Sequence, residues 1–143
     1  MSPELKPGLR HVQTLRVDES MTVPALSNLF CRRDDMPQVL ATAYMIGFIE
    51  WTCLDAIRPH LDAAQRSLGT HVDVSHLAAT PVGLTVTAQV ELVLIEGRRL
   101  RFAVSCHDGT DLIGAGFHER TVIDQARFMD CLAQKASKAL GSS

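Results

Sequence analysis

The sequence has few of the features that would point directly to a function. Aromatic residues make up only 5% of its 143 residues, and no basic run is longer than the pairs Arg32-Arg33 and Arg98-Arg99. Because 14 Lys and Arg stand against 16 Asp and Glu, we expect no nucleic-acid-binding surface. The longest uninterrupted apolar run, residues 43–49, is far too short to span a bilayer.

The cysteines form no motif either. Cys31, Cys53, Cys106 and Cys131 are widely spread, and none belongs to a Cys-x-x-Cys pair of the kind that binds zinc or exchanges disulfides. We therefore expect reduced cysteines and no metal site. The first ten residues carry prolines and charges where a secretory signal needs an apolar segment, so we expect a cytoplasmic protein.

The composition that remains is that of an ordinary globular protein. Hydrophobic residues make up 46% and charged residues 21%, with a formal net charge of −2. These values exclude intrinsic disorder and a highly charged tail. They predict a single domain over residues 1–143, with residues 1–8 as a flexible tail.

One long apolar segment dominates the first half of the chain. Residues 37–54 read PQVLATAYMIGFIEWTCL, which is too long for a strand and begins with a proline suited to a first helical turn. We expect a helix from Pro37 to Leu54 that continues to about His60. Apolar residues lie on every side of it, so the rest of the chain should wrap it. We expect residues 18–36 to form a loop or short helical turn, whose Asp34-Asp35 pair caps this helix.

Most of the chain outside the helix alternates with the period of two that is typical of strands. The predicted strands are 9–17, 67–79, 84–96, 100–107 and 111–123, with turns at 81–83, 96–97 and 108–109. Leu84, Val86, Ala88, Val90, Leu92 and Leu94 mark the inner face of the longest strand. An amphipathic helix over residues 125–140 should close the fold. The pattern predicts an α+β protein whose antiparallel sheet curls around the helix and pairs an open edge with a second copy, as a homodimer.

Glu50 is the sharpest anomaly, because it is the only charged residue between Pro37 and Leu54. A carboxylate on an apolar helix loses hydration unless it is paired, hydrogen-bonded or turned toward a wet cavity. It therefore either forms a structural contact or belongs to a site. Thr42 lies about 80° around the helix and about 12 Å along it, so one helix cannot bring the two side chains into contact.

Three further residues carry open alternatives. His76 shares the inner face of its strand with Val72 and Val74, where a histidine is either a satisfied core residue or a general acid or base. Gly69 fits either a β-bulge or a backbone N–H that binds a developing oxyanion. Arg120 fits either a surface salt bridge or a contact to a phosphate or carboxylate.

Four stretches resemble a known family: ATAYMIGFIEW, SLGTHVDVSHLAATPVGLTV, EGRRLRFAVSCHDG and IGAGFHER. They are similar to the hotdog-fold thioesterases and, within these, to the fluoroacetyl-CoA thioesterases. The resemblance covers most of residues 37–123. It implies a sheet wrapped around a central helix, and a dimer with its active sites at the subunit interface.

The resemblance also implies roles for particular residues. The catalytic threonine, glutamate and histidine of the family correspond to Thr42, Glu50 and His76, while Gly69 and Arg120 correspond to substrate contacts. The family has a phenylalanine-rich lid just before the helix, where this chain has Arg32, Arg33, Asp34, Asp35 and Met36. Met36 is the candidate acyl-pocket residue, and selectivity for fluoroacetyl groups does not follow from the resemblance.

These observations predict an acyl-CoA thioesterase acting on a small acyl group. The chemistry needs no metal or redox cofactor, because coenzyme A arrives as part of the substrate. Two alternatives stay open: a hotdog hydratase or dehydratase, and a protein that binds acyl-CoA without turnover.

Overall fold

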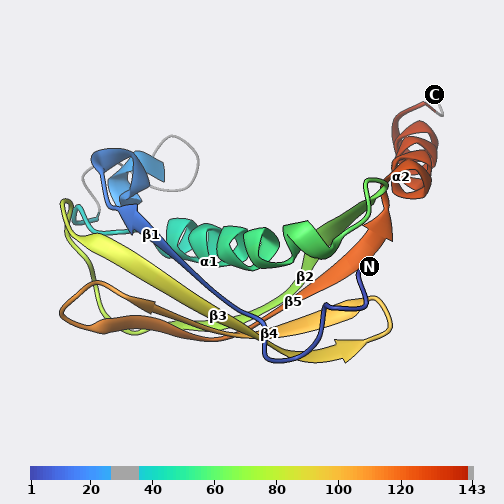
Figure 1. The fold of residues 1–143 in the computed structure, drawn as a ribbon. Helices are drawn as coiled ribbons and strands as arrows, with labels where there is room; N and C mark the ends of the chain where they lie inside the picture. Colours follow the sequence, from blue (N-terminus) through green and yellow to red (C-terminus); the bar gives the residue numbers. More distant parts are fainter. Residues whose placement is uncertain (27–35, 142–143) are drawn as a thin grey trace.

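One antiparallel sheet and one long helix form the body of the molecule in the computed structural model (Figure 1). The structure describes residues 1–26 and 36–141. The sheet has the order β1 (Arg10–Arg16), β3 (Thr85–Glu96), β4 (Arg99–His107), β5 (Leu112–Asp124) and β2 (Gln65–His76), with every neighbouring pair antiparallel. The sheet curls beneath the helix α1 (Thr42–Ile57), as the pattern predicted. The fold is the hotdog fold, of class α+β.

The inner face of the sheet follows the predicted alternation closely until a bulge interrupts it. Val86, Ala88 and Leu92 on β3 are fully buried and pack with the apolar residues of α1. The prediction for Leu94 is wrong, since it is 39% exposed. A register shift between Leu92 and Leu94 inverts the alternation there, so Ile95 packs against the core instead.

The helix α1 begins five residues later than its sequence suggests. Residues Val39 and Leu40 are extended and form isolated bridges to Pro81 and Thr22, and the Leu40 amide donates to the Thr80 carbonyl at 2.8 Å. The prediction of a helical start at Pro37 is therefore wrong, because tertiary pairing captures this backbone. The end agrees better: α1 stops at Ile57, and the 3-10 turn η3 (Arg58–His60) continues it.

The sheet covers only one side of α1, which differs from the fully wrapped helix that the sequence predicts. Met45, Ile49 and Cys53 face the sheet and are buried. On the opposite side a stripe stays open in the single chain, and its members are Thr42, Ala43, Tyr44, Gly47 and Trp51. Tyr44 and Trp51 are 40% and 46% exposed, although both are large and apolar in character.

The N-terminal residues pack against the body, whereas a flexible tail was expected. Leu5 is buried in the core cluster, and the Ser2 amide donates to the His60 carbonyl at 2.7 Å. Two 3-10 turns, η1 (Glu19–Met21) and η2 (Val23–Leu26), follow β1. They agree with the loop or helical turn predicted there, while Asp34 and Asp35 lie outside the described residues.

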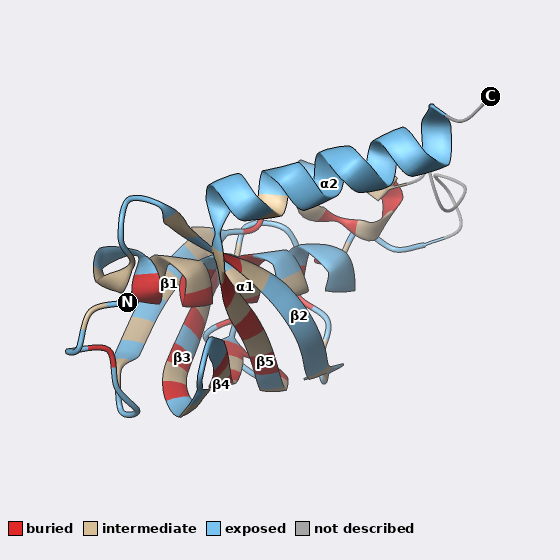
Figure 2. Ribbon diagram, turned by 90° about the vertical axis from the view of Figure 1, so that its right-hand side faces the viewer, coloured by how far each residue is buried: buried red, intermediate tan, exposed pale blue. Residues whose placement is uncertain are grey.

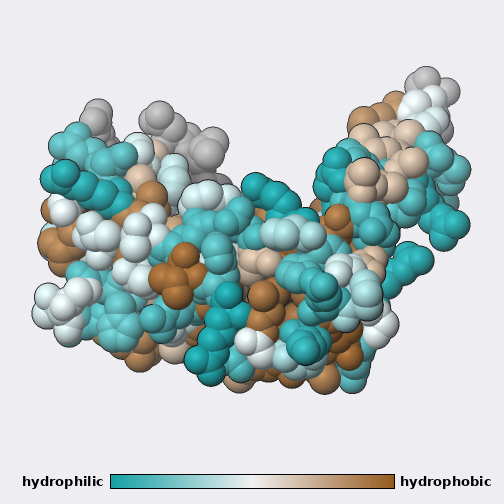
Figure 3. Space-filling view, viewed as in Figure 1, coloured by the Kyte–Doolittle hydropathy of each residue, from teal (hydrophilic) through white to brown (hydrophobic). Residues whose placement is uncertain are grey.

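The helix α2 (Gln125–Leu140) matches its predicted range but does not close the fold. It has no buried residue and is exposed along nearly its whole length (Figure 2). Asp124 caps it by accepting from the Arg127 amide at 3.0 Å, so it follows β5 without a linker. The helix stands clear of the body, and the surface is hollowed above α1 beside it (Figure 3). Within the described part of the chain, no helix is both long and apolar enough to cross a membrane.

Candidate active site

The first residue of α1 and the last residue of β2 meet at one end of the helix. Thr42 Oγ1 and His76 Nδ1 are 2.7 Å apart, which is a short hydrogen bond between side chains 34 positions apart in the sequence. A cavity of about 360 Å³ opens beside them and is lined by Thr42, His76 and residues 77–79. Thr42 belongs to the open stripe of α1, so its hydroxyl lies at a surface that another molecule can reach.

The second ring nitrogen of His76 lacks a partner. His76 Nε2 is buried, and no described residue forms a hydrogen bond with it. An imidazole that accepts a proton at one nitrogen works best when a third group holds the other nitrogen. The single chain therefore supplies the hydroxyl group of Thr42 and the imidazole of His76. Its described residues do not supply the third group, which would bind His76 Nε2.

Glu50 lies in a different cluster, two helical turns further along α1. Its side chain is 38% exposed, and its Oε1 is 3.9 Å from Nε2 of His118, which is fully buried on β5. Gly69 on β2 lies directly beside this carboxylate, because a Cβ built there would be 2.7 Å from Glu50 Oε1. The glycine thus leaves space for the Glu50 carboxylate. The pairing of β2 with β5 also shifts its register between Gly69 and His71.

Arg120 is buried behind this carboxylate and is not the surface cation that its residue type favours. Its Nε donates to Ser67 Oγ at 2.8 Å, and its Nη2 donates to the Ser67 carbonyl at 2.9 Å. Burial lowers the pKa of Arg120, and the nearby Glu50 carboxylate acts in the opposite direction. The negative carboxylate and the buried guanidinium therefore interact electrostatically.

The sequence did not identify His118 as a site residue, because its spacing from the other histidines is not that of metal ligands. Burial lowers the pKa of His118, so the ring is neutral near pH 7, and its contact with Glu50 is not an ion pair. The available signal was its position two residues before Arg120 on the same strand, which places both side chains on one face. Cys53 also lies near this cluster, but burial raises the pKa of its thiol to about 12, which makes it a poor nucleophile.

The structure therefore separates the predicted site residues into two groups. Thr42 contacts His76, while Glu50 lies with Gly69 and Arg120 at a distance of about 12 Å along α1. The remaining candidate, Met36, is 46% exposed and does not line the cavity beside Thr42. Residues 32–35, which complete the predicted lid, lie outside the described residues. No group of three His, Cys, Asp or Glu side chains with metal-binding geometry occurs in residues 1–26 and 36–141.

Comparison with known proteins identifies the family. Residues 17–126 match the family model described as fluoroacetyl-CoA-specific thioesterase. The chain belongs to this family. The fluoroacetyl-CoA thioesterase of Streptantibioticus cattleyicolor is 50% identical over 101 residues, which are 71% of this chain and 73% of that protein. The family assignment makes the protein a thioester hydrolase.

Solved structures of the same family superpose closely. One structure of the fluoroacetyl-CoA thioesterase FlK is 44% identical, covers 92% of this chain and 97% of its own, and has a TM-score of 0.87. A variant of the fluoroacetyl-CoA-specific thioesterase, solved in complex with fluoroacetate and CoA, is also 44% identical. It covers 87% of this chain and 99% of its own, with a TM-score of 0.83.

The neutrality of buried His118 has a consequence for stability. Its pKa is lowered in the folded protein, so below its ordinary value of 6.5 the unfolded chain binds a proton that the folded chain does not. Stability is therefore retained at higher pH and falls as the pH drops below about 6.5, by at most about 1.4 kcal/mol per pH unit for one such group. We expect His118→Gln to show a shallower fall in the free energy of unfolding between about pH 7 and pH 5.

Urea titrations at several pH values across this range measure the slope. The exposed His107 provides a matched control, since His107→Gln should leave the slope of the parent protein unchanged. Equal slopes for His118→Gln and the parent protein would contradict a neutral, buried imidazole at position 118.

Proposed function

We propose that the protein hydrolyses a small acyl-CoA thioester to the free acid and coenzyme A, with Thr42 and His76 as the reacting pair. The observation that carries this proposal is the 2.7 Å hydrogen bond between Thr42 Oγ1 and His76 Nδ1. A neutral imidazole nitrogen at this distance can take the hydroxyl proton as the oxygen attacks a carbonyl. The family membership of the chain supports the same reaction class.

The proton passes through His76 in either form of the reaction. In the covalent form, Thr42 Oγ1 bonds to the acyl carbon, its proton moves to His76 Nδ1, and the departing thiolate takes that proton as the C–S bond breaks. Water then hydrolyses the acyl-enzyme and restores the hydroxyl group. In the direct form, Thr42 orients a water molecule that His76 deprotonates. Both forms give an acid and a thiol, and both need the same two side chains.

The developing oxyanion needs hydrogen-bond donors close to this pair. Since α1 begins at Thr42, the free backbone N–H groups of its first turn and the positive end of its dipole lie beside the reacting atoms. The Gly69 N–H is the second candidate donor. The proposed chemistry uses only side chains, backbone groups and water, with coenzyme A supplied by the substrate.

The proposed active site is completed by a second copy of the chain. The open stripe of α1 carries Tyr44 and Trp51, and β2 is an edge strand of 12 residues beside it. A symmetric dimer covers both features at once, because an edge strand pairs readily with its own copy. Gly47, at the middle of the stripe, has open space around it and allows two helices to approach closely.

Such a dimer also brings the two residue groups together. Residues 72–73 of β2 (Gln65–His76) lie midway between Gly69 and His76, so antiparallel pairing of two copies of β2 about these residues sets His76 of one strand beside Gly69 of the other. The Glu50 carboxylate of one subunit then lies near the Thr42–His76 pair of its partner. The unpartnered His76 Nε2 is the position at which this carboxylate would act.

A second cavity fits the coenzyme portion of the substrate. It has a volume of about 640 Å³, begins one helical turn beyond Glu50 at Leu54, and includes Ser67, which contacts Arg120. Arg58, Asp62 and Arg66 line it, and Arg58 forms an ion pair with Asp55 at 3.3 Å. Arg66 donates two hydrogen bonds to backbone carbonyls, which are uncharged acceptors. Arg66, whose hydrogen bonds within the described part of the chain all go to uncharged acceptors, is therefore the candidate contact for a phosphate of coenzyme A.

The acyl group is proposed only as a small one. The named relatives act on fluoroacetyl-CoA, and this chain has Met36 and four charged residues in the segment before α1. A long, flexible methionine side chain forms a more adaptable pocket wall than an aromatic ring does. The three described cysteines are free, which fits the reducing cytoplasm that we propose as the location.

The reacting pair can be tested by removing its hydroxyl group. We expect Thr42→Val to lower thiol release from acetyl-CoA and fluoroacetyl-CoA by at least about 100-fold, while Thr42→Ser retains part of it. Thr85→Val, at an exposed position of β3, is the matched control and should leave turnover unchanged. Binding of acyl-CoA without thiol release by the parent protein would favour a sensor, and hydration of an enoyl-CoA would favour a hydratase.

The shared site can be tested by complementation. Thr42→Val and Glu50→Gln each inactivate the homodimer, but a mixed dimer keeps one site with Thr42 from one subunit and Glu50 from the other. Refolding an equal mixture should therefore recover about a quarter of parental turnover, since half the dimers are mixed and each has one intact site. Light scattering should report about twice the chain mass of 15.7 kDa. A failure of the mixture to recover activity would contradict a site divided between subunits.

If the cavity lined by Arg66 binds coenzyme A, the effect of a cavity mutation on KM should depend on whether the thiol carries phosphates. We expect Arg66→Ala to raise the KM for acetyl-CoA by about 10-fold and to leave the KM for an acetyl thioester of N-acetylcysteamine unchanged, because the short thiol has no phosphates. Arg10→Ala, at an exposed site on β1, is the matched control. Equal effects of Arg66→Ala on both substrates would exclude a phosphate contact there.

A further inference from the structure

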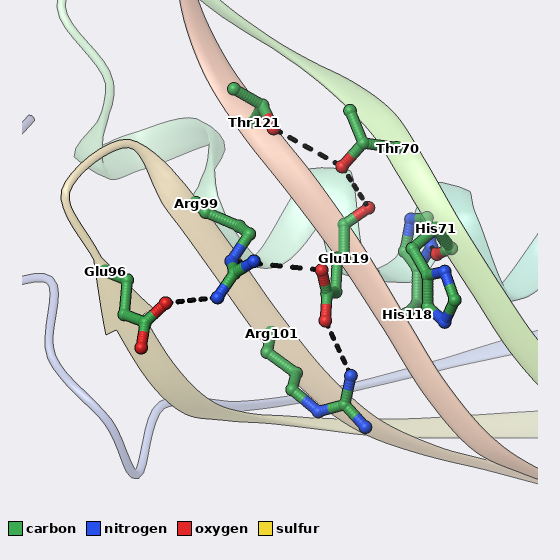
Figure 4. Close-up of polar contacts among 8 residues, drawn as sticks. All are labelled: Thr70, His71, Glu96, Arg99, Arg101, His118, Glu119 and Thr121. Carbon is green, nitrogen blue, oxygen red and sulfur yellow. Dashed lines mark hydrogen bonds and ion pairs between the residues drawn. The ribbon is translucent and has the colours of Figure 1, made fainter.

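His118 is a buried polar residue that contacts the backbone of β2 through one ring nitrogen and the Glu50 cluster through the other. It lies on the inner face of β5, and its side chain is 1% exposed. The next residue on the strand, Glu119, points to the outer face, where it accepts from Arg101 at 2.6 Å (Figure 4). His118 lies beside His71 of β2 in the same view. The alternation of the strand thus directs His118 toward the interior and Glu119 away from it.

The backbone of β2 determines which nitrogen of His118 carries the proton. His118 Nδ1 is 2.8 Å from the carbonyl oxygen of His71, and a carbonyl can only accept. Nδ1 therefore holds the hydrogen. Because burial lowers the pKa of His118, the ring is neutral, and Nε2 presents a lone pair toward the site.

That lone pair faces a guanidinium group. Arg120 Nη1 is 3.1 Å from His118 Nε2, so Arg120 donates and His118 accepts. On its other side Arg120 donates to both the hydroxyl and the carbonyl of Ser67. The guanidinium is planar and its hydrogen-bond directions are fixed, so contacts on two sides determine its orientation.

The oriented guanidinium and the carboxylate converge on the same small volume. A Cβ at Gly69 would be 2.7 Å from Glu50 Oε1, 3.2 Å from His118 Cε1 and 3.5 Å from Arg120 Nη1. All contacts of the guanidinium within the described residues go to uncharged acceptors, namely Ser67 and neutral His118. Its charge is therefore available to Glu50, whose carboxylate opposes the lowering of the Arg120 pKa by burial.

We propose that His118 is a positioning residue for the hydrolytic reaction: its neutral Nε2 orients the Arg120 guanidinium, which in turn holds the Glu50 carboxylate in its working position. The inference rests on the proposed function of Glu50. His118 itself touches no reacting atom, and its effect passes through Arg120. A carboxylate displaced by about 1 Å can lower a rate on the order of 100-fold, so this indirect role is large enough to measure.

Two isosteric variants separate this role from a purely structural one. The side-chain amide nitrogen of His118→Asn takes the place of Nδ1, so it keeps the hydrogen bond to the His71 carbonyl but offers nothing to Arg120. The amide of His118→Gln reaches the place of Nε2, so it keeps an acceptor for Arg120 and loses the bond to His71. If His118 orients Arg120, Asn should lower kcat by about 10- to 100-fold with a nearly unchanged KM, and Gln should restore it to within about threefold of the parent protein.

A structural role predicts the reverse order. If His118 only ties β5 to β2, His118→Asn should keep parental kcat, and His118→Gln should lose both kcat and thermal stability. That result would overturn the proposal, as would equal kcat values in the two variants at equal melting temperatures. Thiol release by the parent protein tests the proposed hydrolysis independently, so failure of one proposal is distinguishable from failure of the other.

A coupling measurement identifies Arg120 as the intermediary. We expect Ser67→Ala to lower kcat as well, because it removes one acceptor of the guanidinium. In an Arg120→Lys background, which keeps the charge but lacks the planar fork, neither His118→Asn nor Ser67→Ala should lower kcat further. Full additivity of His118→Asn with Arg120→Lys would contradict a role that acts through Arg120.

Discussion

A single curled sheet can cover only one side of α1, and most other features of the molecule follow from this constraint. The covered side holds the core residues Met45, Ile49 and Cys53. The uncovered side carries Thr42 together with exposed aromatic residues, and Glu50 lies at its border, against β2 and β5. Burying that aromatic surface is favourable by roughly 25 cal/mol per Å², which gives a second copy of the chain a reason to bind where the chemistry is.

The sequence was sufficient to predict the structure wherever the periodic spacing of apolar residues within one segment determines it. Alternation identified all five strands, and Val86, Ala88, Val90 and Leu92 occupy the inner face as predicted. It failed at Leu94, because a bulge depends on how two strands register and leaves no mark in one of them. It failed at Pro37 for a related reason, since the backbone before α1 pairs with distant residues and does not follow its own helical preference.

In the candidate site, too, features of one segment could be predicted from the sequence, whereas contacts between distant segments could not. Glu50 stood out because a charge on an apolar helix is conspicuous in the sequence itself. The contact between Thr42 and His76 rested on family resemblance until the structure showed their hydrogen bond. His118 could not be recognised from its neighbours, because its role arises from a carbonyl on β2 and a guanidinium two positions along β5. Side chains that act through other side chains are visible only once the strands are assembled.

The absence of a side chain at Gly69 makes three positions that are distant in the sequence depend on one another. Any larger residue there would enter the volume that the Glu50 carboxylate now occupies, with the Arg120 guanidinium close behind it. A chain of this architecture with a bulkier residue at that position must place its acidic group elsewhere or do without it. Glycine, glutamate and arginine at these three positions therefore form a joint signature, by which homologues that retain this carboxylate geometry can be sorted from those that have abandoned it.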